Sequence, residues 1–463
     1  MIKPLQTHLT ILQQEGYQIG RFFKWWTMHP ITYFISHKKP FVSTTKTKTL
    51  VILSTTVFSI FLATTLFTRF YYLSAFLITI FCFEPFVFLF LALGLLMPYE
   101  KVNRFNTKNR IRHRIIENKG MINIGITGSF GKTSVKDFLF EILSGWKDTV
   151  KTPESYNTLF GIAKVVDLEI ISKTKYFVCE MGAYVRGEIA ELCYMIPPQY
   201  AILTAIGTQH LERFKNISNT THAKFELIDS VIPEHSLVNL DNPYIAQRLK
   251  ESKYSNVYTY SLLNSKANFY VAKHKLSSDG TTFTLKYQGK TLEISTSLFG
   301  TSNLYNLTAS ISMSLILGVP LEIIKSKAAE IMPSPHRLEI KKINNAVLID
   351  NAFSSNEEGF ISTLNDLKKL KGRKVLITPG IIELGSSTKL IHKKLGELSS
   401  DIFEKFILVG RSVRTESFEE GIVSENRNRV VYIENSTNLW PMIDSLSIDF
   451  DWILLENDLP DTF

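Results

Sequence analysis

A long apolar block occupies residues 50–97 and is interrupted chiefly by Arg69 and by the Glu84-Pro85 pair. A helix needs about 20 apolar residues to cross a bilayer. The block therefore predicts two spans, at about residues 50–67 and 70–97, joined by a short turn near Arg69. Such a transmembrane helical hairpin leaves both of its ends on the same side of the membrane.

The segment before this block, residues 1–49, mixes aromatic and basic residues. It contains Phe22, Phe23, Trp25, Trp26, Tyr33 and Phe34 together with Arg21, Lys24 and Lys38. Aromatic rings and cations both settle at the headgroup interface, so we expect the segment to lie there. Glu84, within the second span, has two interpretations: a functional intramembrane carboxylate, or a residue at a wet, proline-kinked position that breaks the span.

Beyond residue 120 the chain changes to short apolar runs separated by helix-like stretches. Runs typical of buried strands lie at residues 121–124, 175–179, 200–206 and 236–240. This alternation predicts an α/β fold with a mostly parallel, doubly wound sheet and a ligand site at the strand ends. Residues 254–300 favour an antiparallel insertion at the edge of the same domain, and an apolar helix follows up to residue 317.

A proline-rich boundary near Met332-Pro333 separates this central domain from the rest of the chain. Strand-like runs at residues 345–349, 374–378, 406–409 and 451–455 then predict a second, smaller Rossmann-like domain. The predicted organisation is an interfacial segment (1–49), a transmembrane hairpin (50–97), a basic juxtamembrane linker (98–120), a central domain (121–332) and a C-terminal domain (333–463).

The charge of the chain is concentrated around the apolar block. Its 463 residues are 45% hydrophobic, enough for two or three packed domains, and the net charge is +9. Basic residues flank the block on both sides: Lys3, Arg21, Lys24, Lys38, Lys39, Lys46 and Lys48 before it, and Lys101, Arg104, Lys108, Arg110, Arg112, Arg114 and Lys119 after it. Because basic flanks favour the cytoplasmic side, we expect a multi-pass protein of the cytoplasmic membrane with its catalytic domains in the cytoplasm, and no nucleic-acid partner.

The three cysteines do not suggest a metal site. Cys82, Cys179 and Cys193 form no CxxC pair, and no cysteine and histidine cluster has the spacing of a zinc site. A reducing compartment and no structural metal are the simplest interpretation.

A phosphate-binding loop is indicated between residues 123 and 139. A short strand leads into Gly125, Gly128 and Gly131, which are followed by Lys132-Thr133-Ser134 and a helix-like segment. In such a loop the glycines let backbone N–H groups approach phosphate oxygens, the lysine reaches the terminal phosphates and the hydroxyl holds Mg²⁺. The strict motif would place glycine at position 126, where this chain has Ile126.

Glu180 ends the predicted strand at residues 175–179. An acidic residue at the carboxyl end of a parallel strand faces the ligand crevice, so Glu180 is a candidate Mg²⁺ ligand. The alternative is a solvated carboxylate at a strand end.

Several ordered sequence blocks resemble the Mur ligases, and most of all their MurF branch. The blocks are GITGSFGKTS (125–134), YNTLFG (156–161), CEMGAYVRGEI (179–189), TAIGTQHLERF (204–214), AKFEL (223–227), GTSNLYN (300–306), PHRLE (335–339), IDNAFSSN (349–356) and IIELGSSTKLIHKKLG (381–396). The resemblance covers about residues 121–455. It implies ATP-driven amide formation through an acyl phosphate, which in the MurF branch adds D-alanyl-D-alanine to a UDP-linked muramoyl tripeptide.

The resemblance also implies roles for individual residues. The catalytic residues would be Lys132, Glu180, His210 and Lys224, and two Mg²⁺ ions would be held by Thr133, Glu180 and His210. ATP would be bound by Gly128, Ser129, Gly131, Lys132, Thr133, Ser134, Asn306, Arg337 and Asp350. The residues near the substrate would be Asn157, Thr158 and Asn356. Lys224 matches a lysine that is carbamylated in several members, with a plain salt-bridging lysine as the alternative. Taken alone, Asn306 is also compatible with a helix N-cap, Arg337 with a surface cation and Asp350 with a turn at a strand end.

The chain departs from the MurF pattern in three places. The soluble domain that grips the uridine nucleotide is replaced by the membrane hairpin, which puts a conventional pocket for that substrate in doubt. Glu357 stands where the family usually has proline. An acidic stretch, residues 456–461, replaces a basic turn, which allows a different second substrate.

Three functions remain open from the sequence. The first is a membrane-anchored, MurF-like ligase that joins an amino acid or dipeptide to a membrane-proximal envelope precursor, with ATP, Mg²⁺ and membrane lipids as its other partners. The second is a polyglutamate-type polymer ligase. The third is a catalytically silent, nucleotide-binding scaffold at the membrane.

Overall fold

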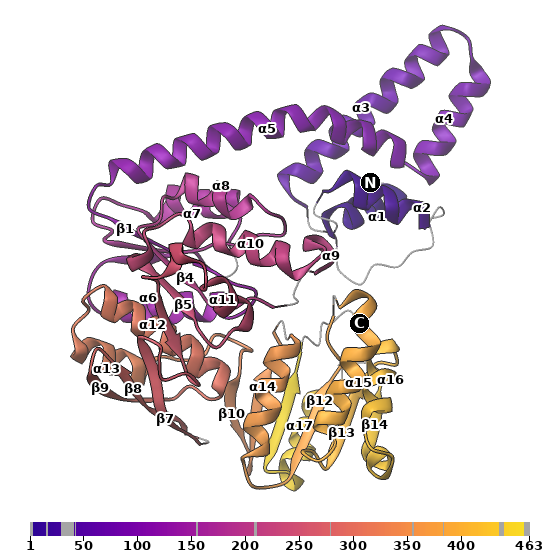
Figure 1. The fold of residues 1–463 in the computed structure, drawn as a ribbon. Helices are drawn as coiled ribbons and strands as arrows, with labels where there is room; N and C mark the ends of the chain where they lie inside the picture. The colour runs from indigo at the N-terminus through magenta and orange to yellow at the C-terminus, as the bar shows by residue number, and fades with distance from the viewer. Residues whose placement is uncertain are drawn as a thin grey trace. The chain divides into compact units, whose positions relative to one another are not determined.

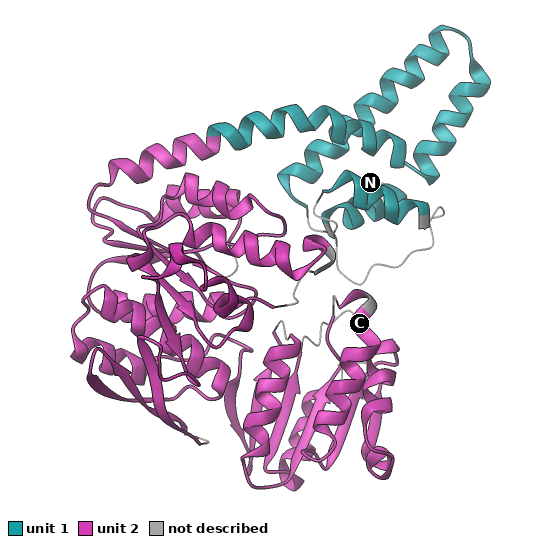
Figure 2. Ribbon diagram, viewed as in Figure 1, with its two compact units in different colours: residues 1–106, 462–463 teal, residues 107–461 magenta. Residues whose placement is uncertain are grey.

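The structure, a computed structural model, describes residues 3–14, 17–28, 41, 43–153, 156–207, 211–277, 279–353, 356–382, 384–434 and 439–457. The chain forms two compact units, which divide between Asn106 and Thr107 (Figure 2). Of the predicted interfacial residues, Tyr33, Phe34 and Lys38 lie outside the described part of the chain.

The first unit is helical. It contains α1 (Lys3–Gln14), α2 (Ile19–Met28), α3 (Thr45–Phe67), α4 (Tyr71–Phe83) and the first part of α5 (Phe86–Glu117) (Figure 1). A small core joins α1 and α2 to Leu50 of α3 and to one face of α5. The α5 residues in this core are Phe86, Leu89, Ala92, Leu93 and Leu96, a spacing that keeps them on one side of the helix.

The hairpin turns at Arg69, where it was predicted, but its second half is not one helix. Arg69 has a φ of 59°, and α4 returns beside α3, with the Phe58 and Phe81 rings stacked at 4.2 Å. The predicted span at residues 70–97 is broken at Glu84-Pro85, where α4 ends and α5 begins. Pro85 has no backbone N–H for the helical ladder, which explains the break.

Glu84 lies at this break and contacts two helices that precede the hairpin. Its Oε2 atom is 3.3 Å from His8 Nε2 and accepts a hydrogen bond of 3.3 Å from Trp26 Nε1. His8 is fully buried and its Nδ1 is 2.8 Å from Pro4 O. The carboxylate therefore joins α1 and α2 to the end of α4.

The segment predicted as a linker, residues 98–120, is mostly helical. The helix α5 continues through Pro98 and ends at Glu117, five residues before β1 (Ile122–Thr127). Most of the predicted linker is therefore a continuation of α5, which runs past the apolar block without interruption.

Basic residues of α5 that were predicted to flank a membrane contact the central domain instead. Arg110 forms a two-pronged ion pair with Asp167, at 2.5 and 2.8 Å. Arg112 donates to Tyr194 O and covers the Tyr194 ring at 4.4 Å. Part of the basic cluster thus serves protein packing, which the sequence pattern alone did not distinguish from lipid contact.

By length and composition, α3 and α5 are the two described helices that could cross a membrane, while α4, with 13 residues, is shorter than a span.

The central domain is built on a nine-stranded sheet with the order β2-β3-β1-β4-β5-β6-β7-β8-β9. Its strands are β1, β2 (Thr149–Lys151), β3 (Tyr176–Glu180), β4 (Tyr200–Leu203), β5 (Ser236–Asn239), β6 (Tyr258–Ser261), β7 (Phe269–Ser277), β8 (Gly280–Tyr287) and β9 (Lys290–Thr296). Neighbours from β2 to β7 pair in parallel, and β7, β8 and β9 pair antiparallel. The doubly wound sheet and its antiparallel edge are both confirmed.

Helices cover both faces of this sheet. One core contains residues of α7 (Leu159–Glu169), α8 (Glu188–Met195), α10 (Ile217–Ile228) and the end of α5. The other contains residues of α6 (Lys132–Ser144), α12 (Thr301–Ile316) and α13 (Leu321–Glu330). In β3, Phe177 and Cys179 belong to the first core, whereas Tyr176 and Val178 belong to the second, as the alternation of a strand buried on both faces requires.

The C-terminal domain has a six-stranded sheet with the order β10-β11-β15-β12-β13-β14. Its strands are β10 (Glu339–Ile343), β11 (Ala346–Asn351), β12 (Lys374–Thr378), β13 (Lys405–Val409), β14 (Val430–Ile433) and β15 (Trp452–Glu456), with α14 (Glu357–Lys368), α15 (Thr388–Ser399), α16 (Val413–Gly421) and α17 (Leu439–Asp449) around them. All neighbours pair in parallel except β10 with β11. The Rossmann-like character is confirmed, and β10 and β14 are edge strands that the sequence did not predict.

Side chains connect the two domains within the second unit. At the start of α12, Thr301 donates from its backbone N and its Oγ1 to the two carboxylate oxygens of Asp366, both at 2.6 Å. Ser334 Oγ donates to Asp137 Oδ2 at 2.9 Å. The first pair of bonds ties the last turn of α14 to the start of α12, and the third ties the segment between the two domains to α6.

Candidate active site

The strand β1 leads into a glycine-rich loop, residues 128–131, and α6 begins directly after it at Lys132. Gly131 has a φ of 81°, and a Cβ there would lie 2.5 Å from Asn306 Oδ1. A Cβ at Gly128 would overlap Thr204 Oγ1. Both positions require glycine, because the loop passes directly against Thr204 and α12.

The loop is fixed to the segment that follows β4. Ser129 N donates to Ala205 O at 2.7 Å, and Ser129 Oγ accepts from Gly207 N at 3.0 Å. These bonds hold the loop in one shape, with the positive end of α6 directly behind it. Such an arrangement suits a phosphate group.

Lys132 lies over the loop, and its Nζ donates to Ser129 O at 3.1 Å. Burial lowers the pKa of Lys132, the negative charge of Glu180 acts in the opposite direction, and the nearby charge of Arg337 lowers it further. The ammonium is therefore held in surroundings where an additional anion would be strongly attracted.

Glu180 lies beside the loop because β3 pairs with β1, with Glu180 opposite Ile126. The side chain is buried, and its Oε1 accepts from Asn157 Nδ2 at 3.0 Å. Its Oε2 accepts no hydrogen bond from the described residues and lies 3.5 Å from Lys136 Nζ. A buried carboxylate oxygen in this state can receive a cation without breaking a hydrogen bond.

Lys224, on α10, is buried, and its Nζ lies 5.7 Å from the centre of the Phe214 ring. Burial lowers the pKa of Lys224 to about 7, and the charge of Lys132 adds to this, whereas three glutamates act in the opposite direction: Glu188, Glu180 and Glu226. Near neutral pH a substantial share of this side chain is therefore an uncharged amine.

A cavity of about 320 Å³ lies between the loop, α12 and the C-terminal domain. The central domain contributes Ser129, Phe130, Gly131, Lys132, Thr133, Ser134, Thr204, Ala205, Asn239, Asp241, Asn242, Pro243, Tyr260, Ser302, Asn303, Tyr305 and Asn306. The C-terminal part contributes Arg337, Leu338, Asn351, Phe353, Asn356, Glu358, Gly359, Ser362 and Thr363. The cavity thus combines cations at one end with amide and aromatic side chains elsewhere, a composition that suits a nucleotide.

Arg337 enters this cavity from the segment that connects the two domains. Its guanidinium covers the Phe353 ring at 4.6 Å. Burial lowers the pKa of Arg337, against the opposing charges of Glu180 and Asp137. The flanking residues His336 and Leu338 both have a positive φ, of 58° and 53°, so the backbone is strained on either side of the arginine.

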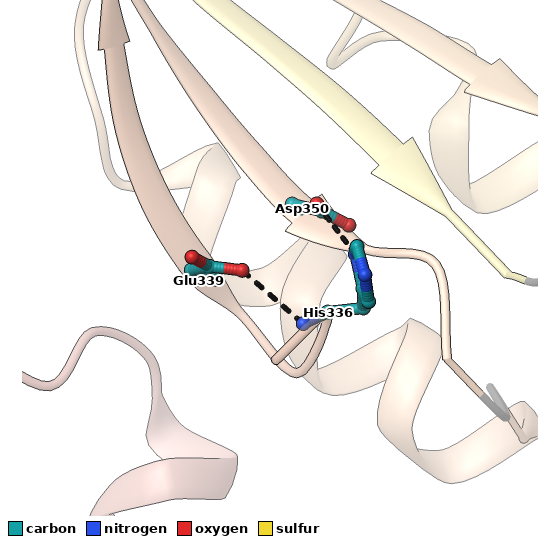
Figure 3. Close-up of side chains that lie close together, drawn as sticks. All are labelled: His336, Glu339 and Asp350. Atoms are coloured by element: carbon teal, nitrogen blue, oxygen red, sulfur yellow. Dashed lines mark hydrogen bonds and ion pairs between the residues drawn. The ribbon is translucent and has the colours of Figure 1, made fainter. Parts of the chain in front are cut away.

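Asp350 does not line the cavity, and its carboxylate is held by Lys341 and His336. Figure 3 shows its carboxylate against His336, whose Nδ1 is 2.8 Å away, and Glu339 beside them. Lys341 Nζ contacts Asp350 at 2.8 Å and Glu339 at 3.1 Å. Burial alone would raise the pKa of Asp350, but the bonds from Lys341 and His336 outweigh it and lower the pKa below its usual value. His336, Glu339 and Asp350 have the spacing of a metal site, yet the Lys341 ammonium already forms an ion pair with each of the two carboxylates.

Comparison with known proteins agrees with this geometry. Residues 126–314 match the Mur ligase middle domain. A UDP-N-acetylmuramoyl-tripeptide–D-alanyl-D-alanine ligase of Buchnera aphidicola is 30% identical over 319 residues, which cover 67% of this chain and 70% of that protein. The chain belongs to the Mur ligase family. Members of this family are ATP-dependent ligases, and within it the chain groups with MurF.

Solved structures of MurF share the fold of this Mur ligase. MurF from Acinetobacter baumannii matches with a TM-score of 0.68 at 23% identity, covering 78% of each chain. MurF from Thermotoga maritima in complex with ADP also gives 0.68, at 20% identity, covering 78% of this chain and 81% of that one.

The structure brings together many of the residues that the family resemblance singled out. Ser129, Gly131, Lys132, Thr133, Ser134, Asn306, Arg337 and Asn356 all line the cavity. Six others do not line the cavity: Gly128, Asn157, Thr158, Glu180, Lys224 and Asp350. Of these, Asn157 donates a hydrogen bond to Glu180 beside the loop. His210 lies outside the described residues, so its predicted metal role stays a prediction.

Two of the local alternatives, those for Asn306 and Arg337, can be examined directly. Asn306 lies inside α12, which begins at Thr301, so its interpretation as an N-cap is wrong. Arg337 is half-buried and enters the cavity, unlike a surface cation. Asn356 both lines the cavity and caps α14, its Oδ1 accepting from Gly359 N at 2.9 Å. Thr158 is the N-cap residue of α7, without a side-chain bond to the helix.

The acidic stretch predicted at residues 456–461 begins inside the C-terminal sheet. Glu456 is the last residue of β15 and is fully buried, and both of its carboxylate oxygens accept from Asn351 Nδ2 at 2.9 Å. The Glu456 carboxylate therefore lies inside the C-terminal domain, bonded to Asn351. Residues 458–461 lie outside the described part of the chain.

Magnesium, which the family uses, fits the residues present. A buried Glu180 oxygen that accepts no hydrogen bond and a Thr133 hydroxyl at the cavity wall are the hard oxygen donors that Mg²⁺ prefers.

Sequence reasoning missed two residues around Glu180. Lys136 faces Glu180 Oε2, and Thr152 Oγ1 accepts from Glu180 N at 3.0 Å. For Lys136 a signal existed: it is a lysine one helical turn after Lys132, next to apolar positions of α6. Thr152 carries no such signal, because its partner is 28 residues away.

Proposed function

We propose that this Mur ligase is a MurF-like enzyme that forms an amide bond on a cell-envelope precursor, and that it works at a membrane. The observation that carries the catalytic part is the cavity in which Lys132, Asn306 and Arg337 converge from two domains. ATP is the proposed energy source, and an amino acid or dipeptide is the proposed amine.

The residues divide the work by their chemistry. The loop N–H groups and Lys132 hold the phosphates, Asn306 reads the adenine, and Arg337 offsets charge as the γ-phosphoryl group moves to the acceptor carboxylate. The amine then attacks the acyl phosphate and phosphate leaves. Negative charge accumulates in both steps, so fixed cations contribute most of the stabilisation.

Thr133 and Glu180 are the proposed magnesium ligands, with His210 at a second ion. When bound, Mg²⁺ supplies positive charge at the phosphate oxygens. Lys224 is proposed as the carbamylated lysine, because a substantial share of its amine is uncharged near neutral pH and can combine with CO₂.

The membrane part of the proposal rests on α3 and α4. In these helices small polar side chains are buried and large apolar side chains are exposed, the opposite of a helix in a soluble domain. The only buried residue of α4 is Ser74, and its Oγ donates to Thr65 Oγ1 of α3 at 2.8 Å. Large apolar side chains point outward instead: Ile52, Ile60, Phe61, Leu66, Phe67, Phe70, Tyr71, Tyr72, Leu73, Phe76, Ile78 and Phe83. Hydroxyl groups between helices and phenylalanines outside are typical of helices packed in lipid.

The proposed acceptor therefore lies at the membrane. A helix of 23 residues, such as α3, is about 35 Å long and can cross the hydrocarbon layer. The 13 residues of α4 return about 20 Å and stop at Glu84. Glu84, held by His8 and Trp26, is then a structural carboxylate at the point where the returning helix stops, about 15 Å short of the length of α3.

The test uses the full chain in detergent or nanodiscs with ATP, Mg²⁺ and envelope-precursor extracts. Phosphate release that requires both acceptor and amine, together with a product heavier by one amino acid or dipeptide, supports the proposal. Repeated additions would favour the polymer ligase, and ATP binding without acceptor-stimulated turnover would favour the silent scaffold.

Lys132→Ala is the matched negative control. Loss of this cation is expected to lower turnover roughly 100- to 1,000-fold. Lys151→Ala, which removes a nearby cation that pairs with Asp137 at 2.9 Å, is expected to leave turnover close to wild type. Unchanged ligation by Lys132→Ala would contradict the assigned site.

A further inference from the structure

Lys136 is a fully buried lysine close to the active site. It lies on α6, one turn after Lys132, and its side chain has no exposed surface. Its neighbours Val135, Phe138 and Leu139 belong to the apolar core between α6 and the sheet. Burying an ammonium in such surroundings costs several kcal/mol unless a matching anion faces it.

Two carboxylates face this ammonium, and they differ in what else they bind. Asp137 Oδ1, at 3.7 Å, also contacts Lys151 at 2.9 Å, and Asp137 Oδ2 accepts from Ser334. Glu180 Oε2, at 3.5 Å, accepts no hydrogen bond from the described residues. The ion pair with Lys136 is thus the interaction that the structure shows at this Glu180 oxygen.

The two oxygens of Glu180 are consequently held from different sides. Asn157 Nδ2 donates to Oε1 at 3.0 Å, Lys136 faces Oε2, and the backbone N is bonded to Thr152. A carboxylate held in this way cannot rotate freely. Partners that orient a metal ligand commonly affect metal affinity as strongly as the ligand's own surroundings do.

We propose that Lys136 is a positioning residue, which orients the Glu180 carboxylate for the divalent cation that accompanies the nucleotide. The 3.5 Å separation is longer than a close hydrogen bond, so Oε2 keeps the capacity to accept a cation while Lys136 fixes its direction. This inference rests on the nucleotide and metal site of the proposed function, and it is independent of the acceptor and the amine.

The experiment measures cation binding rather than turnover. Mn²⁺ serves as the probe, and its affinity for the full-length protein saturated with a non-hydrolysable ATP analogue is measured by electron paramagnetic resonance. Lys136→Met is expected to weaken Mn²⁺ binding about 10- to 100-fold. Lys151→Met, which removes another cation beside Asp137 without touching Glu180, is the matched control and is expected to keep wild-type affinity.

Two further variants keep the test decisive. Because loss of a buried charge can unfold a protein, the charge-retaining variant Lys136→Arg is measured in parallel. Its longer, planar head cannot occupy the same position, so Mn²⁺ binding is expected to weaken, and the thermal midpoint shows separately how far the larger side chain destabilises the fold. In a Glu180→Gln background, Lys136→Met is expected to cause no additional loss, since the oriented carboxylate is already absent.

The outcomes separate the two hypotheses. Wild-type Mn²⁺ affinity in a folded Lys136 variant overturns the positioning role and leaves the proposed function intact. Failure of the wild-type protein to bind Mn²⁺ with the nucleotide analogue overturns both. A lowered thermal midpoint with unchanged Mn²⁺ affinity would show that Lys136 only balances buried charge, and it would also overturn the inference.

Discussion

At the scale of single residues, Lys224 and Lys132 illustrate how burial prepares a side chain for chemistry. Both have a lowered pKa because they are desolvated, and the positive charge of Lys132 lowers the pKa of Lys224 further. Lys132 donates to the loop backbone. Lys224, with a pKa of about 7, has the uncharged form that carbamate formation needs.

Lys224 is expected to carry CO₂. At about pH 8 and with bicarbonate present, native mass spectrometry should show the wild-type protein heavier by one CO₂, and the Lys224→Arg variant should lack this increment, because a guanidinium stays charged. Ligase activity should fall as pH drops below about 7, where the amine becomes protonated. Full activity of Lys224→Arg would instead identify a plain salt-bridging lysine.

Gly131 provides a prediction about backbone strain. Its φ of 81° and the nearness of Asn306 Oδ1 leave no room for a Cβ. Gly131→Ala is expected to cost about 1–3 kcal/mol of unfolding free energy and to weaken binding of an ATP analogue. Urea unfolding measures the loss of unfolding free energy, and titration calorimetry measures the binding of the ATP analogue. Gly289→Ala is the control, because Gly289 also has a positive φ, of 72°, but open space around it; it should affect stability alone.

At the scale of elements, the segment that joins the two domains is held by charge. His336, with its positive φ, stays bonded to Asp350, and Lys341 bonds to the same carboxylate. The pKa of Asp350 is lowered by these partners. A carboxylate with a lowered pKa stabilises the fold above its unfolded pKa, and this contribution is lost as pH falls through the folded pKa.

Acidification is therefore expected to destabilise this segment. Urea unfolding of the wild-type protein should show stability falling as pH drops below about 4, and Asp350→Asn should flatten that part of the profile while lowering stability at neutral pH. Asp279→Asn is the control, because the Asp279 side chain is 79% exposed and pairs with Lys342 at the surface. An identical profile for Asp350→Asn and wild type would contradict the assignment.

The elements that the sequence predicted are those with a strong pattern. Parallel strands such as β3 and β12 are buried throughout and appear as continuous apolar runs. The edge strands β10 and β14 were missed because they are only partly buried; β10 carries polar residues, and β14 is an apolar run of only four residues. The length of α5 was missed because an internal proline and a change from apolar to basic residues resemble a boundary.

The site residues could be predicted where a sequence motif fixes the backbone. They were harder to predict where tertiary contacts determine which side chains lie together. The residues of the loop follow from their order in the sequence, and Asn306 and Arg337 from the family resemblance. The bond between Lys341 and Asp350 joins residues 9 positions apart, and the ion pair between Lys136 and Glu180 joins residues 44 positions apart. Neither contact can be predicted from a local sequence pattern. The burial of Glu456 likewise depends on a distant partner, Asn351.

At the scale of the whole molecule, the outward-facing side chains of α3 and α4 lead to a topology prediction. Tyr72, at the turn, is 96% exposed. In a Cys82→Ser background, Tyr72→Cys should react with a membrane-impermeant maleimide added outside intact spheroplasts, whereas Lys101→Cys should react only after permeabilisation. Cys179 and Cys193 are buried, and burial raises the pKa of Cys193 to about 12, so neither should compete. Labelling of Tyr72→Cys only from inside would contradict a crossing hairpin.

The contacts of Glu84 also impose an order of assembly. Trp26 is separated from Glu84 by 58 positions, and His8 comes earlier still, so the ribosome completes α1 and α2 well before their carboxylate partner exists. Until then these two helices lack both Glu84 and the α5 side of their shared core, and afterwards one residue joins the beginning of the chain to its hairpin. A nascent chain stalled before residue 84 should accordingly remain sensitive to protease at its amino terminus, whereas one released after α5 should be protected.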